Sequence, residues 1–220
     1  MGLLQLLFPP KCIICKDNIK KGTLCSFCAY KLDILKKCRT DSICVDGETV
    51  EITSLFPYEN ETVKSLLFAL KRKGNADLFA YASDLYREAA GGMTGECVAV
   101  NVPRSRRNIA KYGYDHVAKP LKIMCKTVTG FVYAPLLKRK LVFFKTVDQK
   151  ELDREGRRNN AKGKFFAVKK DIPRNILLAD DVITTSSTAS ECIRQLRRVY
   201  PHCNIKCVFL ASTGGDFPTV

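Results

Sequence analysis

Two closely spaced pairs of cysteines near the start of the chain constrain its fold more than any other feature. The pairs are Cys12-x2-Cys15 and Cys25-x2-Cys28. Two such pairs, joined by a short loop, can place four thiolates tetrahedrally around one zinc ion. A catalytic zinc keeps one position open for water, whereas four thiolates close the coordination shell. We therefore expect a structural zinc site held by Cys12, Cys15, Cys25 and Cys28.

The other seven of the 11 cysteines give weaker signals. Cys38 and Cys44 are either a second ligand pair or two unliganded thiols. Five more are scattered singly in apolar surroundings, as buried thiols are: Cys97, Cys125, Cys192, Cys203 and Cys207. The odd total favours metal ligation over disulfides. The apolar stretch at residues 3–8 is too short to span a membrane and lacks the flanks of a signal peptide, so we expect a cytoplasmic protein.

From Glu51 onward, apolar runs typical of buried strands alternate with amphipathic patterns typical of helices. We expect strands at 52–58, 97–102, 175–179 and 205–210, and helices at 61–71, 77–90, 115–127 and 188–198. This alternation indicates an α/β fold with a central parallel sheet. We therefore divide the chain into a cysteine-rich zinc-binding module at 1–50 and an α/β domain at 51–220.

One segment combines features that suit a phosphorylated sugar. The apolar run Ile176-Leu177-Leu178-Ala179 is followed by Asp180-Asp181, a Val-Ile spacer and five hydroxyl residues, Thr184, Thr185, Ser186, Ser187 and Thr188. The run delivers two carboxylates to the carboxyl end of a strand, where open α/β sheets bind ligands. The hydroxyl-rich turn at a helix start suits a phosphate, and vicinal carboxylates suit ribose hydroxyls, directly or through Mg²⁺. Alternatively, the segment is an ordinary strand end with a helix cap.

The charge of the chain points to the same class of partner. Lys and Arg number 37 against 22 Asp and Glu, which gives a net charge of +15. A charge of this size favours phosphate-rich partners such as nucleic acid, nucleotides or phosphorylated sugars. The length of 220 residues excludes a large multidomain enzyme.

The segment from Ile176 to Thr188 resembles the ribose-5-phosphate-binding signature of the type I phosphoribosyltransferases. Together with the N-terminal cysteines it is similar to the ComF, or GntX-like, family, in which a double zinc ribbon precedes a type I phosphoribosyltransferase-like domain. Ser186 stands where the family has glycine, a residue that tolerates positive φ and close backbone approach. We therefore expect an altered loop geometry or phosphate affinity at this position.

Further motifs extend the resemblance over most of the chain. Val102-Pro103-Arg104 and Gly113-Tyr114-Asp115-His116 follow a family segment in which Tyr112 replaces an arginine and Asp115-His116 stand for Asn-Gln. A third match runs from Gln149 to Phe165, and a fourth from Tyr58 to Gly74. The resemblance implies binding of 5-phosphoribosyl-1-diphosphate with Mg²⁺, with its diphosphate held by Lys71, Lys73, Arg104, Arg106 and Arg107.

The resemblance leaves three functions open. The chain is an enzyme that transfers the phosphoribosyl group to an unidentified nitrogen nucleophile, an accessory factor of weak or no turnover that binds single-stranded DNA, or a zinc-ribbon scaffold. The vicinal acids argue against the scaffold. The family resemblance also implies a role in competence for DNA uptake, and with it a DNA-uptake helicase partner. We expect the two histidines, His116 and His202, to be structural or exposed rather than general bases.

Overall fold

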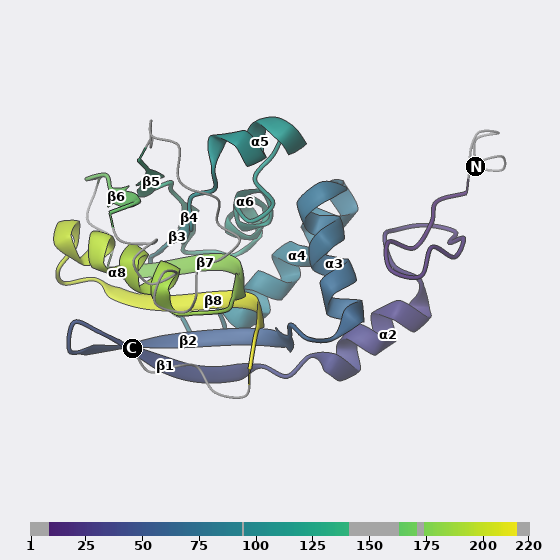
Figure 1. Ribbon diagram of the computed structural model, residues 1–220, viewed down its shortest axis with the longest axis horizontal. Helices are drawn as coiled ribbons and strands as arrows, with labels where there is room; N and C mark the ends of the chain where they lie inside the picture. Colours follow the sequence, from purple (N-terminus) through teal and green to yellow (C-terminus); the bar gives the residue numbers. More distant parts are fainter. Residues whose placement is uncertain (1–8, 94, 141–162, 171–173, 215–220) are drawn as a thin grey trace, which may run out of the picture.

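A six-stranded sheet forms the centre of the computed structural model, which describes residues 9–93, 95–140, 163–170 and 174–214 (Figure 1). Its strand order is β1-β2-β8-β7-β3-β4. The strands are β1 (Arg39–Val45), β2 (Glu48–Pro57), β3 (Cys97–Asn101), β4 (Phe131–Tyr133), β7 (Asn175–Ile183) and β8 (Asn204–Ser212). Only β1 runs antiparallel to its neighbour, and the other four pairings are parallel. The expected α/β fold with a central, mostly parallel sheet is confirmed.

Both faces of this sheet are covered, which explains its long apolar runs. One face packs against α3 (Glu61–Arg72), α4 (Ala76–Ala89) and α6 (Ala118–Thr127), in a core that includes Leu66, Leu85 and Leu121. The other face packs against α8 (Ser187–Val199) and a small antiparallel sheet of β5 (Leu137–Arg139) and β6 (Phe165–Ala167). Alternate residues of β7 enter the two cores, with Leu177 in the first and Leu178 in the second.

Local side chains define where the helices start and stop. Asn60 and Asn75 accept hydrogen bonds from backbone N–H groups in the first turns of α3 and α4, as N-cap residues do. A short helix, α5 (Arg106–Tyr112), is capped by Ser105 and ends at Gly113, whose φ of 75° is in the left-handed region that favours glycine.

The strands and helices expected from the sequence are present, with ends that differ by a few residues. The largest differences are in two strands. β2 starts at Glu48 and not at residue 52. β7, which was expected to end at Ala179, continues to Ile183 because Val182 and Ile183 pair with Ala211 and Ser212 of β8. The start of α6 lies at Ala118 rather than at residue 115. The sequence patterns did not indicate β1, the short strands β4, β5 and β6, or α5.

The cysteine-rich segment lies at the end of the molecule opposite β5 and β6 (Figure 1). It leads into α2 (Ser26–Leu35), whose Leu32 is fully buried in the core beneath α3 and α4. Lys36 forms an ion pair of 3.0 Å with Glu88 of α4. Residues 39–50, which we expected in the cysteine-rich module, form β1 and the first part of β2 in the central sheet. We therefore propose that the module ends near Lys37.

Within the described ranges, no helix is both long and apolar enough to cross a membrane.

The hydroxyl of Tyr114 joins the end of α3 to the segment that precedes α6. It accepts a hydrogen bond from Gly74 N at 2.7 Å and donates one to Leu70 O at 3.1 Å. We expect Tyr114→Phe to lower the free energy of unfolding by about 1–3 kcal/mol, because a half-buried backbone N–H loses its acceptor. Urea denaturation measures this value.

The matched control is Tyr112→Phe, because the Tyr112 hydroxyl has no hydrogen bond to the described residues. We expect this control to change the free energy of unfolding by no more than about 0.5 kcal/mol. Equal losses in the two variants would contradict the role given to the Tyr114 hydroxyl.

Candidate functional site

The four cysteines of the two pairs converge on one point. The sulfur atoms of Cys12, Cys15, Cys25 and Cys28 all lie within 4.8 Å of one another. The Cys15 and Cys25 sulfurs are 3.7 Å apart. Four Zn–S bonds of about 2.3 Å in tetrahedral geometry require sulfur atoms about 3.8 Å apart. The cluster therefore has the donor set and the spacing to hold a zinc ion.

Backbone N–H groups around the cluster donate hydrogen bonds to cysteine sulfur atoms and so stabilise the thiolate form. Cys25 is the N-cap residue of α2, and its sulfur accepts a hydrogen bond from Cys28 N at 3.3 Å. Burial opposes ionisation of Cys12, but backbone N–H hydrogen bonds, that of Cys25 first among them, lower its pKa to about 6. Burial raises the pKa of Cys28 to about 11. A zinc ion would favour the thiolate form of all four residues and so offset the cost of bringing them together.

Cys38 and Cys44 lie apart from this cluster. Both are exposed, and Cys44 is on β1. Among the described residues, the only group of three or more candidate ligands is the four-cysteine cluster. The structure therefore gives no support to a second site at Cys38 and Cys44.

We predict that Cys25→Ser abolishes tight zinc binding, because one thiolate of a closed shell is lost and the cap of α2 is changed. Elemental analysis after gel filtration measures the zinc content. Cys44→Ser is the matched control and should keep the wild-type zinc content, because Cys44 is exposed on β1. Full zinc in the Cys25 variant would rule out this ligand set.

The two vicinal acids lie near the carboxyl end of β7, a central strand of the sheet. They line a cavity of about 380 Å³ together with Thr184, Thr185, Ser187 and Thr188. The strand and the first turn of α8 therefore face the same space. The structure thus brings the two acids and these four hydroxyl residues to one cavity, and their roles toward a ligand stay predictions.

Asp181 is almost fully buried and makes several charged contacts. Its Oδ2 atom accepts from Lys71 Nζ at 2.6 Å and from His116 Nε2 at 2.8 Å, while Oδ1 accepts from Val182 N. His116 is 2% exposed and also contacts Arg104 Nη1. These contacts join β7, α3 and the segments that follow β3 around one carboxylate.

Asp180 has a different environment from its neighbour. Its Oδ1 atom accepts from Asp181 N at 2.9 Å, and its carbonyl oxygen accepts from the hydroxyl of the buried Tyr86 at 3.1 Å. Burial raises the pKa of Asp180 well above its ordinary value, and the charge of Asp181 adds to this shift. The Arg104 and Lys71 cations act in the opposite direction. A cationic ligand or metal would therefore stabilise the ionised pair.

Ser186 differs from the sequence expectation. Its φ of −67° and ψ of −7° are in the right-handed helical region, so serine causes no backbone strain here. The residue is 1% exposed, and it does not line the cavity. Its buried hydroxyl has no hydrogen-bond partner in the described part of the chain. Ser186 therefore does not adopt the positive φ that glycine tolerates, and the expected effect on loop geometry or phosphate affinity stays a prediction.

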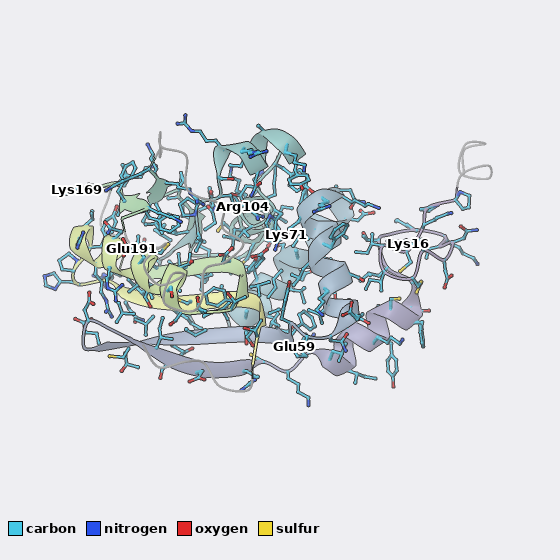
Figure 2. All side chains as sticks on the ribbon, viewed as in Figure 1. Lys16, Glu59, Lys71, Arg104, Lys169 and Glu191 are labelled. Carbon is cyan, nitrogen blue, oxygen red and sulfur yellow. The ribbon has the colours of Figure 1, made fainter. Side chains whose placement is uncertain are left out.

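Several basic residues surround the cavity, and they differ in part from those expected. Arg104 lines it, and Lys71 reaches Asp181 from α3. Figure 2 shows both of these side chains in the centre of the molecule, above the sheet. Arg139 at the end of β5 and Lys164 just before β6 also line the cavity, and neither was expected from the sequence. Burial, followed by the charge of Arg139, lowers the pKa of Lys164.

Three expected diphosphate ligands do not line this cavity. Lys73 lines a separate hollow between α3 and the cysteine-rich segment. Arg106 lines a second cavity that shares Arg104 and Arg139 with the first, and Arg107 is exposed on α5. The sequence could not separate Arg106 and Arg107 from Arg104, because their positions depend on how the segment after β3 turns into α5.

The motif from Gln149 to Phe165 lies mostly outside the described residues. In its last part, Gly163 N donates a hydrogen bond of 3.0 Å to Oε1 of Glu191. Glu191 is a buried carboxylate on α8, and it also accepts from Gln195. It fixes the backbone beside Lys164, which turns toward the cavity. A glutamate at a position that the helix pattern predicts to be buried is the signal in the sequence that could have identified Glu191.

The whole sequence matches no protein-family model and no curated protein. Among solved structures, it is similar to two adenine phosphoribosyltransferases. One is the enzyme from Saccharomyces cerevisiae in complex with D-2,5-dideoxy-2,5-imino-altritol 1,6-bisphosphate and adenine. The match has 14% sequence identity and a TM-score of 0.39, and it covers 86% of this chain and 89% of that one. The match to the second adenine phosphoribosyltransferase has 14% sequence identity and a TM-score of 0.39, and it covers 84% of this chain and 89% of that one. With TM-scores of 0.39 and 14% identity, these two similarities carry no argument about function.

Proposed function

We propose that the chain is a phosphoribosyltransferase-like protein of the ComF kind that binds 5-phosphoribosyl-1-diphosphate with Mg²⁺. One observation carries the proposal: two vicinal acids of β7 and the hydroxyl-rich start of α8 line the same cavity, beside Arg104, Arg139 and Lys164. A sugar with phosphates at both ends needs these three kinds of group at once. Acids bind its hydroxyls or metal, a helix start binds one phosphate, and cations bind the diphosphate.

The 5-phosphate is assigned to the turn from Thr184 to Thr188. Backbone N–H groups in the first turn of a helix lack partners within the helix, and the helix dipole favours an anion there. Four of the five hydroxyl residues line the cavity and can donate to phosphate oxygens. Ser186 has helical backbone angles and supports this turn without the glycine of the family signature.

The ribose and the metal are assigned to Asp180 and Asp181. Mg²⁺ prefers oxygen ligands and is commonly bound by one or two carboxylates plus substrate phosphates. The pair of acids fits this requirement, since both line the cavity and burial raises the pKa of Asp180 in the absence of a cation. When bound, Mg²⁺ would neutralise charge on the diphosphate as it leaves.

The diphosphate is assigned to Arg104, Arg139 and Lys164, with Lys71 within reach at Asp181. In a transfer reaction the bond from ribose C1 to the diphosphate oxygen breaks while a bond from C1 to a nitrogen nucleophile forms. Negative charge grows on the departing oxygen, and fixed cations stabilise it. The cavity residues suit this leaving group and do not identify the acceptor.

The four-cysteine cluster is assigned a structural zinc ion. All four donors are thiols, so a bound ion would have a closed shell with no position for water or substrate. Its role in the proposal is to fold the first part of the chain and to hold α2 against the core. The role in DNA uptake and the helicase partner that the family resemblance implies belong to this proposal as well.

We predict that Asp180→Asn/Asp181→Asn weakens binding of 5-phosphoribosyl-1-diphosphate with Mg²⁺ by about tenfold or more, because a loss of about 1.4 kcal/mol gives that factor. The substitution removes negative charge and keeps the side-chain shape. Isothermal titration calorimetry measures the affinity. Circular dichroism should show a folded protein.

The control is Asp77→Asn/Asp84→Asn, which removes the same charge from two exposed positions on α4. It should bind the sugar diphosphate as wild type does. Wild-type protein that does not bind 5-phosphoribosyl-1-diphosphate at all would refute the proposed function.

A second candidate function, binding of single-stranded DNA, is favoured by a separate observation. The second cavity, of about 740 Å³, opens beside the first and combines basic with aromatic and apolar side chains. Its lining includes Arg106, Lys122, Lys138, Arg139 and Lys140 together with Ile109, Tyr133 and Phe166. Basic groups can track a phosphate backbone while aromatic rings stack on unpaired bases.

We predict that single-stranded DNA binding falls steeply with salt, because released counterions drive such association. Arg106→Ser/Lys138→Ser should reduce the slope of log affinity against log salt by about 1–2, since each phosphate contact on a single strand contributes about 0.7. Fluorescence anisotropy over a salt series measures the slope. Lys20→Ser/Lys21→Ser, at the far end of the molecule, should change it less. Equal slopes for wild type and both double variants would exclude this cavity as the binding site for single-stranded DNA.

A further inference from the structure

A hollow of about 350 Å³, which we call the α3 hollow, lies between α3 and the cysteine-rich segment. The apolar part of its lining is formed by Ile13 and Ile14 from the segment and by Phe68 and Ala69 from α3. None of the described residues that line it also lines the cavity proposed to bind the sugar diphosphate. The proposed function therefore gives this hollow no role.

Part of the apolar lining of the α3 hollow is exposed to solvent. The helix already buries a complete apolar face against the core, which includes Val63 and Leu66. Phe68 lies outside this face and is 49% exposed, and Ile13 and Ile14 are only partly buried. Single exposed apolar residues are common on proteins, whereas apolar side chains gathered in one place mark a binding surface.

Both walls of the α3 hollow are held by contacts within the described chain. On one wall, Ile13 N donates a hydrogen bond of 3.0 Å to Thr23 O, and the first cysteine pair flanks the two isoleucines. On the other wall, Arg72 Cζ lies 4.4 Å from the centre of the Phe68 ring. The surface is therefore preformed, which lowers the entropic cost of binding a partner.

Three lysines surround the apolar lining: Lys16, Lys64 and Lys73. Figure 2 shows Lys16 on the cysteine-rich segment, where its ammonium donates to Ile13 O. Lys64 forms an exposed ion pair of 2.7 Å with Glu61, and the ammonium of Lys73 is exposed with no partner in the described ranges. No Asp or Glu among the described residues lines the hollow. Its charge therefore complements a partner that carries negative charge.

The lining favours an acidic peptide over other partners. Single-stranded nucleic acid stacks its bases on exposed aromatic rings, but Arg72 lies over the Phe68 ring and the rest of the apolar lining is aliphatic. A second copy of this chain carries a net charge of +15 and would be repelled. Ligand pockets bury most of a small molecule, whereas the exposed Phe68 and Lys73 leave this hollow open.

We propose that the α3 hollow binds an acidic segment of a partner protein that carries apolar side chains between its carboxylates. The apolar side chains pack on Ile13, Ile14 and Phe68, and the carboxylates meet the ammonium groups of Lys16 and Lys73. Burial of apolar surface supplies the affinity, and the lysines select acidic sequences. This surface is independent of the proposed sugar site, so either assignment can fail without the other.

Fluorescence anisotropy of the full chain, purified with zinc, tests the proposal with defined peptides. The probes are labelled hexapeptides with blocked ends, in which two glutamates precede and two follow a pair of leucines, isoleucines, phenylalanines or methionines. We expect at least one of the four to bind with a Kd below about 1 mM. The same peptide with two serines in place of the apolar pair should bind at least about tenfold more weakly, because only its charges remain.

Phe68→Ser should weaken binding of the acidic apolar peptide about tenfold or more, because it removes an aromatic contact from the lining. Phe27→Ser is the matched control. Phe27 is also an exposed helical phenylalanine with a cation over its ring, Lys31 Nζ at 4.5 Å, and it does not line the hollow. The control should bind the peptide as wild type does.

Lys73→Glu should reverse the charge preference of the α3 hollow. It should bind the acidic peptide about fivefold more weakly than wild type, and bind a peptide with lysines in place of the glutamates more tightly than wild type. Lys126→Glu makes the same change at an exposed position in the last turn of α6 and should alter neither affinity by more than about twofold.

The proposal is overturned if none of the four peptides binds below about 1 mM, or if the two phenylalanine variants lose affinity equally. It is also overturned if Phe68→Ser weakens binding of an oligothymidine as much as that of the peptide, because the hollow would then be a nucleic-acid site. If circular dichroism shows that Phe68→Ser does not fold, the charge preference of Lys73→Glu decides the question.

Discussion

The burial of β7 on both faces is the constraint on which the site depends. The strand lies between β3 and β8, and its residues Ile176 to Ala179 are fully buried. Charged side chains at these positions would lose their hydration without any partner to replace it. Polar function on this strand is therefore confined to its carboxyl end, where Asp180 and Asp181 lie and where α8 begins. The same end of a parallel sheet collects the segments that follow β3, which supply Arg104.

The site balances opposite charges that would each be costly alone. Asp181 is 7% exposed, and its contacts with Lys71 Nζ at 2.6 Å and with His116 Nε2 at 2.8 Å compensate its burial. Arg104, Arg139 and Lys164 line the other wall of the cavity, and the acids that line it in the described part of the chain are Asp180 and Asp181. Burial first, and then the charge of Arg139, lowers the pKa of Lys164. A polyanion bound there would favour the charged form of Lys164 and so act against this shift.

The sequence predicted what depends on local pattern and on neighbours along the chain. Continuous apolar runs located β3, β7 and β8, and the Asp-Asp step that follows the apolar run of β7 located the acids, because a buried strand has only one place for them. It did not separate Arg104 from Arg106 and Arg107, because the chain turns into α5 between them and only the fold decides which side chain reaches the cavity. Arg139 and Lys164 were missed for the same reason. They come from β5 and the start of β6, whose pairing joins segments far apart in the sequence.

The four-cysteine cluster and the proposed sugar site both adjoin α3. Ile13 and Ile14, which adjoin the first cysteine pair, pack against the core beneath this helix and face its Ser65, Phe68 and Ala69. One turn further along α3, Lys71 forms its ion pair with Asp181. A zinc ion that fixes the cysteine loop would thus also fix one side of the helix that carries Lys71. The helix α3 thus contacts the cysteine-rich segment along its length and the acid pair at its end, although no cysteine of the cluster lines the cavity.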